Sequence, residues 1–328
     1  KKPASGSFQT GADVLEKMAE EHELPAKILE WRGFAKLKST YTEALLNLLD
    51  ANSRIHTTYN QINTTTGRLS STNPNLQNIP IRTDMGLKIR ECFIAKPGHK
   101  IISSDYSQVE LRLMAVVAGV KALKEAFNHG IDIHAATAAK IFGVPADQVD
   151  HNLRRHAKTI NFGVIYGISQ YGLAKQLGIS ADEAKIYIDN YFRQMPEIKA
   201  YMEKTIAFAH KNGFVLTPYG RKCFVFGIND KNKRISSNAE RAAINAPLQG
   251  GAADIIKMAM NQCLWQLQKG GFKTKMLLQV HDELVFEAPD NEVEAIKQLV
   301  KETMENVVHF DIPFIAETGS GQNWAEAH

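Results

Sequence analysis

Cysteine is scarce in this sequence, and long hydrophobic runs are absent. The 328 residues include three cysteines, Cys92, Cys223 and Cys263, with no CxxC pair. This distribution argues against a disulfide framework or a zinc site and is typical of a reducing, cytoplasmic compartment. The apolar stretch at residues 113–120 is far shorter than the ~20 residues of a membrane helix. The sequence therefore predicts no membrane partner.

An initiating methionine and a targeting leader are also lacking. The sequence begins at Lys1, and no basic segment followed by an apolar one comes after it. We therefore expect a piece of a longer protein. Hydrophobic residues make up 44% and charged residues 23% of the chain, a mixture typical of globular proteins. A chain of this length can bury a large core and form more than one lobe.

The net charge of +4 is small, so the placement of the cations matters more than their number. They gather in three places, which are Arg154, Arg155 and Lys158; Arg221 and Lys222; and Lys231, Lys233, Arg234 and Arg241. Solvated surface is the commoner fate of such side chains. Patches that bind phosphate are the alternative. Composition leaves both interpretations open.

Hydrophobic spacing and breaker residues divide the chain into helical and extended segments. Residues 13–50 have helical spacing, whereas residues 51–100 look irregular and extended. The segments expected after them are a strand at 100–104, helices from 107 to about 211, a hairpin at 213–226, a helix at 239–267, a hairpin at 275–287 and a helix from 291. A strand region that resumes after a long helical block predicts a discontinuous α+β domain with a helical insertion.

Asp105 begins a DYSQVELR segment directly after an apolar strand. A carboxylate at the end of a buried strand is held in a fixed position. Ser107 and Glu110 form an S-x-x-E pattern, which predicts a capping box at the start of the next helix. Taken alone, Asp105 is equally well a turn residue, and Glu110 is equally well only the partner in the box.

A second acidic group lies at the tip of the hairpin expected at residues 275–287. His281, Asp282 and Glu283 stand between two apolar stretches. Acidic turn residues are common, but carboxylates brought together by the fold suit Mg²⁺, which prefers hard oxygen ligands. Asp105 and Asp282 could thus hold two ions roughly 3.5–4 Å apart for an in-line displacement at phosphorus.

A stripe of cations and aromatic rings follows one face of the helix expected at residues 154–166. Arg154, Lys158, Phe162 and Tyr166 recur every four residues, after a predicted cap at Asp150. Cations near a helix start bind phosphates, and aromatic rings offer a flat surface for a base and its sugar. The stripe has the order of a nucleoside triphosphate. The alternative is a surface helix whose lower half belongs to the core.

These three segments resemble motifs A, C and B of family A DNA polymerases, and along the chain they follow the family's order A, B, C. The motif B pattern R-x-x-x-K-x-x-x-F-G-x-x-Y-G is complete from Arg154 to Gly167, and motif C is QVHDELVFE. Residues 66–80, 240–254 and 319–328 also look like family hallmarks. The resemblance covers nearly the whole chain and is nearest to the bacterial members.

The resemblance implies a template-directed DNA polymerase that adds deoxynucleoside triphosphates to a primer 3′-hydroxyl, uses two Mg²⁺ ions and releases pyrophosphate. The implied metal-binding and catalytic positions are Asp105, Tyr106 (through its carbonyl), Asp282, Glu283 and Lys158. The implied nucleotide-binding positions are Arg154, Lys158, Phe162, Tyr166, His134, Gln108, Glu110 and Arg82. Contacts to primer–template DNA are expected from Arg68, Gln77, Asn78, Arg241, Asn245, Gln249, Gln279 and His281.

The same resemblance implies an α+β, right-hand fold of palm, fingers and thumb, with an antiparallel palm sheet and a large helical insertion, the fingers. Residues 1–55 would be the C-terminal part of the thumb, 56–110 and 236–328 the palm, and 111–235 the fingers. No exonuclease domain precedes these segments, so we expect no proofreading in this piece, and we expect a monomer. Gly251 departs from the pattern because a small hydroxyl residue is typical there.

Three other activities remain as alternatives. A single-subunit RNA polymerase shares the two carboxylates and the Arg/Lys helix, but the resemblance places Glu110 where it would exclude a 2′-hydroxyl. A two-metal nuclease could use Asp105 and Asp282 but would have no need of a triphosphate-binding helix. A non-catalytic DNA-binding module would leave acids facing DNA without metal, which is electrostatically unfavourable.

Overall fold

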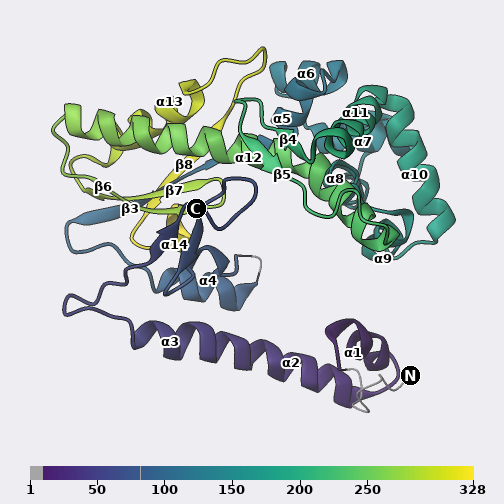
Figure 1. The fold of residues 1–328 in the computed structure, drawn as a ribbon. Coiled ribbons are helices and arrows are strands. Elements are labelled where there is room, and N and C mark those ends of the chain that lie inside the picture. Colours follow the sequence, from purple (N-terminus) through teal and green to yellow (C-terminus); the bar gives the residue numbers. More distant parts are fainter. Residues whose placement is uncertain (1–9, 82) are drawn as a thin grey trace. The chain divides into compact units, whose positions relative to one another are not determined.

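Figure 1 shows the protein as a computed structural model that describes residues 10–81 and 83–328. Arg82, one of the expected nucleotide-binding residues, lies outside the described residues. The chain forms two compact units, one made of residues up to Tyr59 together with Ser71–Ile89, the other of Asn60–Ser70 and Arg90–His328. Apart from Gln77 and Asn78, every described residue expected in the site belongs to the second unit.

The first unit is mainly helical. It contains α1 (Ala12–Ala19), α2 (Glu23–Leu37), a π-helical turn (Lys38–Thr42) and α3 (Glu43–Leu46). These bounds confirm the helical prediction for residues 13–50. Tyr41 is buried inside this unit, where its hydroxyl donates a hydrogen bond to the carbonyl oxygen of Asn78 at 2.5 Å.

Residues 51–100 contain more regular structure than the sequence predicts. The elements found there are β1 (Thr58–Asn60) and β2 (Ser70–Thr72), which pair with each other, a 3₁₀ turn (Leu76–Asn78) and α4 (Asp84–Glu91). The prediction of irregular chain is wrong for α4. Its large apolar side chains, Met85, Leu87 and Ile89, alternate along the sequence, and this spacing is typical of a strand rather than of a helix.

The second unit contains a four-stranded sheet (Figure 1). Its strands, in spatial order, are β6 (Lys275–Val280), β7 (Glu283–Pro289), β3 (His99–Tyr106) and β8 (Ala316–Gly321), and every neighbouring pair is antiparallel. Ile102 on β3 and Phe286 on β7 are fully buried and stand opposite each other. The expected strand at residues 100–104 and the expected hairpin at 275–287 are confirmed. Packed against the sheet are α13 (Val293–Asn306) and the short α14 (Trp324–Ala327).

A block of helices interrupts the sheet between β3 and β6. Its members are α5 (Val109–Val117), α6 (Lys121–Asn128), α7 (Ile133–Phe142), α8 (His151–Ile165), α9 (Gln170–Leu177), α10 (Ala181–Gln194) and α11 (Pro196–Asn212). Helices of this block end just before Gly119, Gly130, Gly143 and Gly167, which all have positive φ, a conformation of little steric cost for glycine. The predicted helical insertion is therefore confirmed.

The helix α12 (Lys233–Lys269) joins the helical block to the sheet layer. It follows the hairpin of β4 (Phe214–Leu216) and β5 (Lys222–Phe224), and it contacts α5 and α11 as well as α13. Small residues allow this close packing: an added Cβ at Gly250 would lie 2.5 Å from the Thr217 methyl group. The helix also continues through Gly251, the one position that departs from the family pattern.

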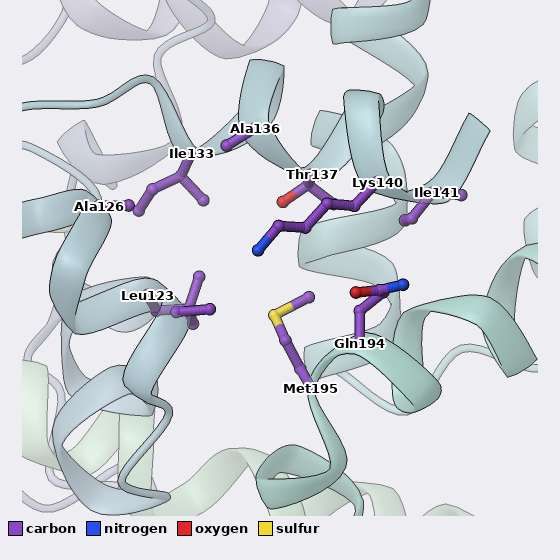
Figure 2. Close-up of a pocket in the computed structure, with 10 residues that line it drawn as sticks. Leu123, Ala126, Ile133, Ala136, Thr137, Lys140, Ile141, Gln194 and Met195 are labelled. Atoms are coloured by element: carbon purple, nitrogen blue, oxygen red, sulfur yellow. The ribbon is translucent and has the colours of Figure 1, made fainter. Parts of the chain in front are cut away.

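A small apolar pocket lies among α6, α7 and the C-terminal end of α10 (Figure 2). Leu123, Ile133 and Met195 form its walls, and the side chain of Lys140 points into it. Thr137 also lines the pocket and donates a hydrogen bond to Asn161 on α8, so the pocket borders the polar contacts described below. In the part of the chain that the structure describes, no helix is both long and apolar enough to cross a membrane.

Candidate active site

The two aspartates predicted to bind metal meet at one end of the sheet. Asp105 is near the end of β3 and stands opposite Glu283, the first residue of β7. Asp282 immediately precedes β7, and its carbonyl oxygen accepts a hydrogen bond from the backbone NH of Tyr106 at 3.2 Å. The connection between β6 and β7 has only two residues, and its sharp turn places His281 at a φ of 54°. This tight turn fixes Asp282 next to the end of β3.

Burial makes both carboxylates hard to ionise, and neighbouring acids add to the effect. Burial, reinforced by the charges of Asp282 and Glu283, raises the pKa of Asp105 to about 7. Burial also raises the pKa of Asp282 to about 6, although the nearby Arg68 guanidinium acts in the opposite direction. Two partly buried carboxylates with other acids beside them are stabilised by a cation between them. The ends of β3 and of the β6–β7 turn therefore suit a positively charged ligand.

The oxygen donors fit a hard divalent cation whose remaining ligands come from a substrate. The expected donors are two carboxylates and the backbone carbonyl of Tyr106, whose hydroxyl donates to the carbonyl oxygen of Met304 at 2.6 Å. The described residues contain no cluster of three or more metal-ligating side chains. Mg²⁺ commonly binds through one or two carboxylates together with substrate phosphates and water. The donor set therefore fits Mg²⁺ better than a metal that needs a complete protein cage.

Glu283 has a different environment from the two aspartates. Its carboxylate accepts hydrogen bonds from the Ser103 hydroxyl at 2.6 Å and from the Trp324 indole NH at 2.7 Å. Burial alone would raise the pKa of Glu283, but hydrogen bonds from His328, Ser103 and Trp324, together with the Arg90 charge, lower it below its usual value. Glu283 is thus ionised and fixed by its neighbours, as a supporting group would be.

Glu110 does not take part in a capping box, so that prediction is wrong. The helix α5 begins at Val109, its N-cap is Gln108 in the left-handed conformation, and no side chain caps it. The Glu110 side chain is buried; it accepts a hydrogen bond from the Arg68 guanidinium at 2.5 Å and another from the Tyr166 hydroxyl. The ion pair with Arg68 and the hydrogen bond from Tyr166 replace the local backbone contact, because burial strengthens these two interactions.

The contact between Glu110 and Tyr166 connects the carboxylate end of the sheet with α8. Tyr166 is the C-cap of α8, and Glu110 lies in the first turn after β3. Burial and the neighbouring Glu110 carboxylate raise the pKa of Tyr166 above its ordinary value, so its hydroxyl stays protonated and donates. Tyr166, at the aromatic end of the α8 stripe, therefore contacts the segment that follows Asp105.

The α8 stripe has the local structure that the sequence predicts. Asp150 caps the helix by accepting a hydrogen bond from the Leu153 NH at 2.7 Å. The Phe162 and Tyr166 rings are stacked, with centroids 6.3 Å apart. Lys158 is exposed and has no hydrogen bond or ion pair with any residue that the structure describes. An added Cβ at Gly163 would lie 3.0 Å from Ile168, so the glycine makes room for the turn that follows the helix.

Arg154 and His134 meet at the N-terminus of α7. Asp132 caps this helix by accepting from the backbone NH of His134 at 2.9 Å, and it also accepts from Arg154 Nε at 2.6 Å. The His134 side chain is buried, and its Nδ1 lies 3.1 Å from the Asn161 amide nitrogen. Arg154 and His134, both expected to bind phosphate, are thus brought together. Arg154 is held by Asp132, 22 residues away in the sequence, and His134 by Asn161, 27 residues away.

The residues expected to contact DNA on α12 lie on one side of the helix. Arg241, Asn245 and Gln249 recur every four residues, and an added Cβ at Gly167 would lie 3.1 Å from Arg241 Cγ. This part of α12 is therefore next to the end of α8. The side-chain oxygens of Asn245 and Gln108 are buried without a hydrogen-bond partner among the described residues. Unpaired buried acceptors are unusual and fit positions that face a ligand.

The remaining residues expected to contact DNA lie near the hairpin or in the first unit. Gln279 on β6 donates a hydrogen bond to the carbonyl oxygen of His281, which orients both residues at the β6–β7 turn. Gln77 and Asn78 belong to the 3₁₀ turn of the first unit. The capping oxygen of this turn is the Asn75 side chain, which accepts from the Gln77 NH.

Comparison with known proteins decides the family. The sequence profile described as DNA polymerase family A matches residues 1–326. The chain belongs to DNA polymerase family A.

Relatives of this family A chain include DNA polymerase I of Pseudomonas aeruginosa, which is 48% identical over the whole chain, and DNA polymerase I of Caldicellulosiruptor bescii, which is 44% identical over 99% of it. The chain covers 36% and 38% of these two relatives, which is about a third of their length. A solved structure, the POL domain of Pol1 from M. smegmatis in complex with DNA primer-template and dNTP, is 42% identical and has a TM-score of 0.93. It is matched over 100% of this chain and 58% of its own length. The expected family and α+β polymerase fold are confirmed.

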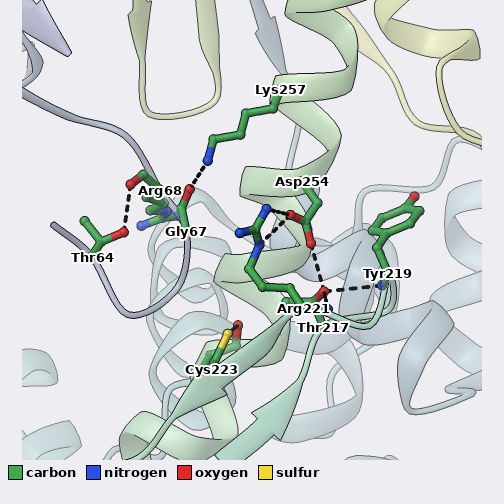
Figure 3. Close-up of polar contacts among 10 residues, drawn as sticks. Thr64, Gly67, Arg68, Thr217, Tyr219, Arg221, Cys223, Asp254 and Lys257 are labelled. Atoms are coloured by element: carbon green, nitrogen blue, oxygen red, sulfur yellow. Dashed lines mark hydrogen bonds and ion pairs between the residues drawn. The ribbon is translucent and has the colours of Figure 1, made fainter. Parts of the chain in front are cut away.

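The family A chain also contains a polar cluster that sequence reasoning missed (Figure 3). Asp254 on α12 is buried; it accepts from the Thr217 hydroxyl at 2.8 Å and from Arg221 Nε at 2.7 Å. Lys257, one turn later, donates to the carbonyl oxygen of Gly67 at 2.5 Å. Arg221 was noticed only as part of a basic patch, and no spacing rule pairs it with a carboxylate 33 residues away.

This cluster holds the loop that carries Arg68. The Thr64 hydroxyl donates to the Arg68 carbonyl oxygen at 2.7 Å, and Lys257 binds the carbonyl of the preceding residue (Figure 3). Gly67 has a φ of 80°, and an added Cβ there would lie 2.8 Å from Arg221. Hydrogen bonds to the carbonyl oxygens of Gly67 and Arg68 therefore fix the loop, and the Arg68 side chain binds Glu110.

Proposed function

We propose that this chain is the polymerising part of a template-directed DNA polymerase, which adds deoxynucleoside triphosphates to a primer 3′-hydroxyl and releases pyrophosphate. The observation that carries the proposal is the contact of Glu110 with both Arg68 and Tyr166. It joins the carboxylate end of the sheet to the cation–aromatic stripe of α8 in one site. The relatives named DNA polymerase I, and the similar structure that contains DNA primer-template and dNTP, support these substrates.

Asp105, Asp282 and the Tyr106 carbonyl are the proposed ligands of two Mg²⁺ ions. When bound, these ions supply Lewis-acid charge for an in-line displacement at phosphorus. The raised pKa of each aspartate supports this assignment because the pair gains most from a cation. Glu283 keeps its charge through its own hydrogen bonds and holds the start of β7 in place.

The α8 stripe and the start of α7 are proposed to bind the incoming nucleotide. Arg154 and Lys158 bind phosphates, and His134 contributes a hydrogen bond to the same group. Phe162 contacts the sugar, and Tyr166 stacks near the templating base. Gln108 and Glu110 are proposed to lie at the sugar. Arg82, which is outside the described residues, completes the proposed set.

Lys158 also neutralises charge that develops on the leaving pyrophosphate. Its ammonium group is exposed and has no partner among the residues described, so no ion pair must be broken before it binds. A preorganised cation at a site of developing charge lowers the barrier because it needs no rearrangement during the reaction.

Contacts to the primer–template are proposed for eight residues: Arg68, Gln77, Asn78, Arg241, Asn245, Gln249, Gln279 and His281. Minor-groove acceptors are common to all base pairs, so such contacts can test pairing geometry without reading sequence. We assign residues 1–55 to the thumb, 56–110 and 236–328 to the palm, and 111–235 to the fingers. The helical block between β3 and β6 supports the fingers assignment. All assigned residues come from one chain, so a monomer suffices, and none of them is assigned to proofreading.

The test is extension of a labelled primer on a DNA template with Mg²⁺ and either deoxy- or ribonucleoside triphosphates. Extension with the deoxy form only is expected. Extension with ribonucleotides would favour an RNA polymerase, and shortening of the primer would favour a nuclease. No change to the primer, with DNA still bound, would favour a non-catalytic binding module.

Asp282→Ala is the decisive variant in this assay. It should abolish extension and leave DNA affinity largely intact, because affinity comes mostly from phosphate contacts elsewhere. Asp290→Ala removes an exposed aspartate just beyond the far end of β7 and serves as the matched control. Near-normal extension by Asp282→Ala would reject the two-metal assignment.

A further inference from the structure

A fully buried asparagine lies beside the stacked rings of α8. Asn161 has no exposed surface and directly precedes Phe162. Its amide is within hydrogen-bond distance of the Thr137 hydroxyl, at 3.2 Å from Nδ2 and 3.3 Å from Oδ1, and its Nδ2 lies 3.1 Å from His134 Nδ1. A buried amide without partners is costly, so these bonds hold the side chain between Thr137 and His134.

The orientation of the Asn161 amide decides which nitrogen of His134 carries the proton, and in the structure its Nδ2 faces His134 Nδ1. The Asn161 NH₂ group can only donate, so Nδ1 of the imidazole accepts and carries no hydrogen. In the neutral ring the proton is then on Nε2. This nitrogen has no hydrogen bond to any residue that the structure describes. His134 is 2% exposed, and its Nε2–H group is a donor without a partner among the described residues.

The charges around His134 favour the neutral ring. Burial, together with the Lys158 and Arg154 cations of α8, lowers the pKa of His134 to about 4, although Asp132 on its own helix acts in the opposite direction. The ring therefore carries no charge between pH 5 and 8. Asp132 binds both the His134 backbone and Arg154, so the imidazole and the Arg154 guanidinium belong to one site.

We infer that Asn161 is a positioning residue that holds His134 in the Nε2–H tautomer, so that the ring offers a neutral hydrogen-bond donor to the phosphates bound by Arg154 and Lys158. The identity of the anion rests on the proposed function, whereas the tautomer does not. A neutral donor keeps its strength across physiological pH. The cations supply the charge, and the imidazole supplies a bond of fixed direction.

The tautomer can be read directly in the free chain, without nucleotide or DNA. Protein with ¹⁵N-labelled histidine would be examined by NMR, and His134→Gln identifies the signal among the 11 histidines. We expect the Nε2–H form in the wild type. Asn161→Asp replaces the donor with an acceptor of the same shape, so Nδ1 should become protonated and the pKa of His134 should rise. Thr137→Val is the control, because it removes the other partner of Asn161 and leaves the His134 bond.

Nucleotide binding gives the second measurement. The affinity for deoxyadenosine triphosphate with primer–template and Mg²⁺ would be measured between pH 6 and 8. Removal of the hydrogen bond in Asn161→Leu should weaken binding roughly tenfold. In Asn161→Asp a raised His134 pKa makes the ring cationic at low pH, so binding should strengthen several-fold as the pH falls, whereas the wild type and Thr137→Val should change by less than about twofold.

An Nδ1–H signal in the wild type would overturn the inference. So would equal losses of melting temperature in Asn161→Leu and Thr137→Val with an unchanged tautomer and pH profile, because Asn161 would then act only in packing. If the Nε2–H form is found but no variant or wild type binds the nucleotide, the proposed function fails and the positioning role of Asn161 stands.

Discussion

Replacement of Glu110 separates the local and the tertiary roles of this residue. A capping box accepts Glu and Gln equally, so Glu110→Gln would be nearly neutral if capping mattered. In the structure Glu110 instead accepts from the Arg68 guanidinium at 2.5 Å and from the Tyr166 hydroxyl. The Gln side chain keeps one acceptor oxygen but loses the charge and the second acceptor. Both bonds are therefore weakened while the shape of the side chain is kept.

The expected loss of stability follows from these contacts. Hydrogen bonds to a charged group contribute about 1.5–3 kcal/mol each. The low end applies here because the Arg68 side chain is 32% exposed and regains water when its partner is lost. We expect Glu110→Gln to lower the free energy of unfolding by about 1–2 kcal/mol and Glu110→Ala by about 2–4 kcal/mol.

Urea denaturation of both variants, combined with Arg68→Met in a double-mutant cycle, measures the coupling. Discrimination between sugars is measured in parallel, as the ratio of kcat/KM for deoxy- and ribonucleoside triphosphates. Removal of a steric clash of about 1–3 kcal/mol in Glu110→Ala should lower this ratio by roughly 5- to 150-fold. Neutral stability of Glu110→Gln with no coupling to Arg68 would refute the ion-pair role. An unchanged ratio in Glu110→Ala would refute the sugar contact.

Three other substitutions test separate parts of the site. Lys158→Ala should lower the single-turnover rate of extension by roughly 10²–10³, whereas Lys140→Ala, in the pocket of Figure 2, should not; equal rates for the two variants would remove Lys158 from the catalytic residues. Phe162→Tyr should raise incorporation of dideoxynucleotides, because its hydroxyl can replace the missing 3′-hydroxyl; unchanged competition between the two nucleotides would reject the sugar contact. Asp254→Ala should lower the free energy of unfolding by about 2–4 kcal/mol, since it leaves Arg221 and a buried hydroxyl without their acceptor; the pairing would be contradicted if Asp254→Ala and Arg221→Met were additive in urea denaturation.

Short-range features of this family A chain were predictable because their causes act within a few residues. The cap at Asp150, the helix end at residue 166 and the four-residue spacing of the α8 stripe all depend on neighbours one or two turns away. The strand before Asp105 and the hairpin around Asp282 were predictable for the same reason, since apolar runs and turn residues are local signals. The sequence missed α4 because its apolar residues alternate like those of a strand.

The sequence by itself determined the helices, the strands and the chemical types of the site residues, because propensity, capping and hydrophobic period are local. Only the tertiary structure decided which of these residues meet. Glu110 turns away from its own helix start to Arg68, 42 residues before it, and to Tyr166, 56 residues after it. No sequence pattern marks Asn161, which is buried beside His134 only because α7 packs against α8. Such pairs depend on how distant segments pack and on the loss of water around their polar groups. The spacing of residues along the chain predicts neither of these.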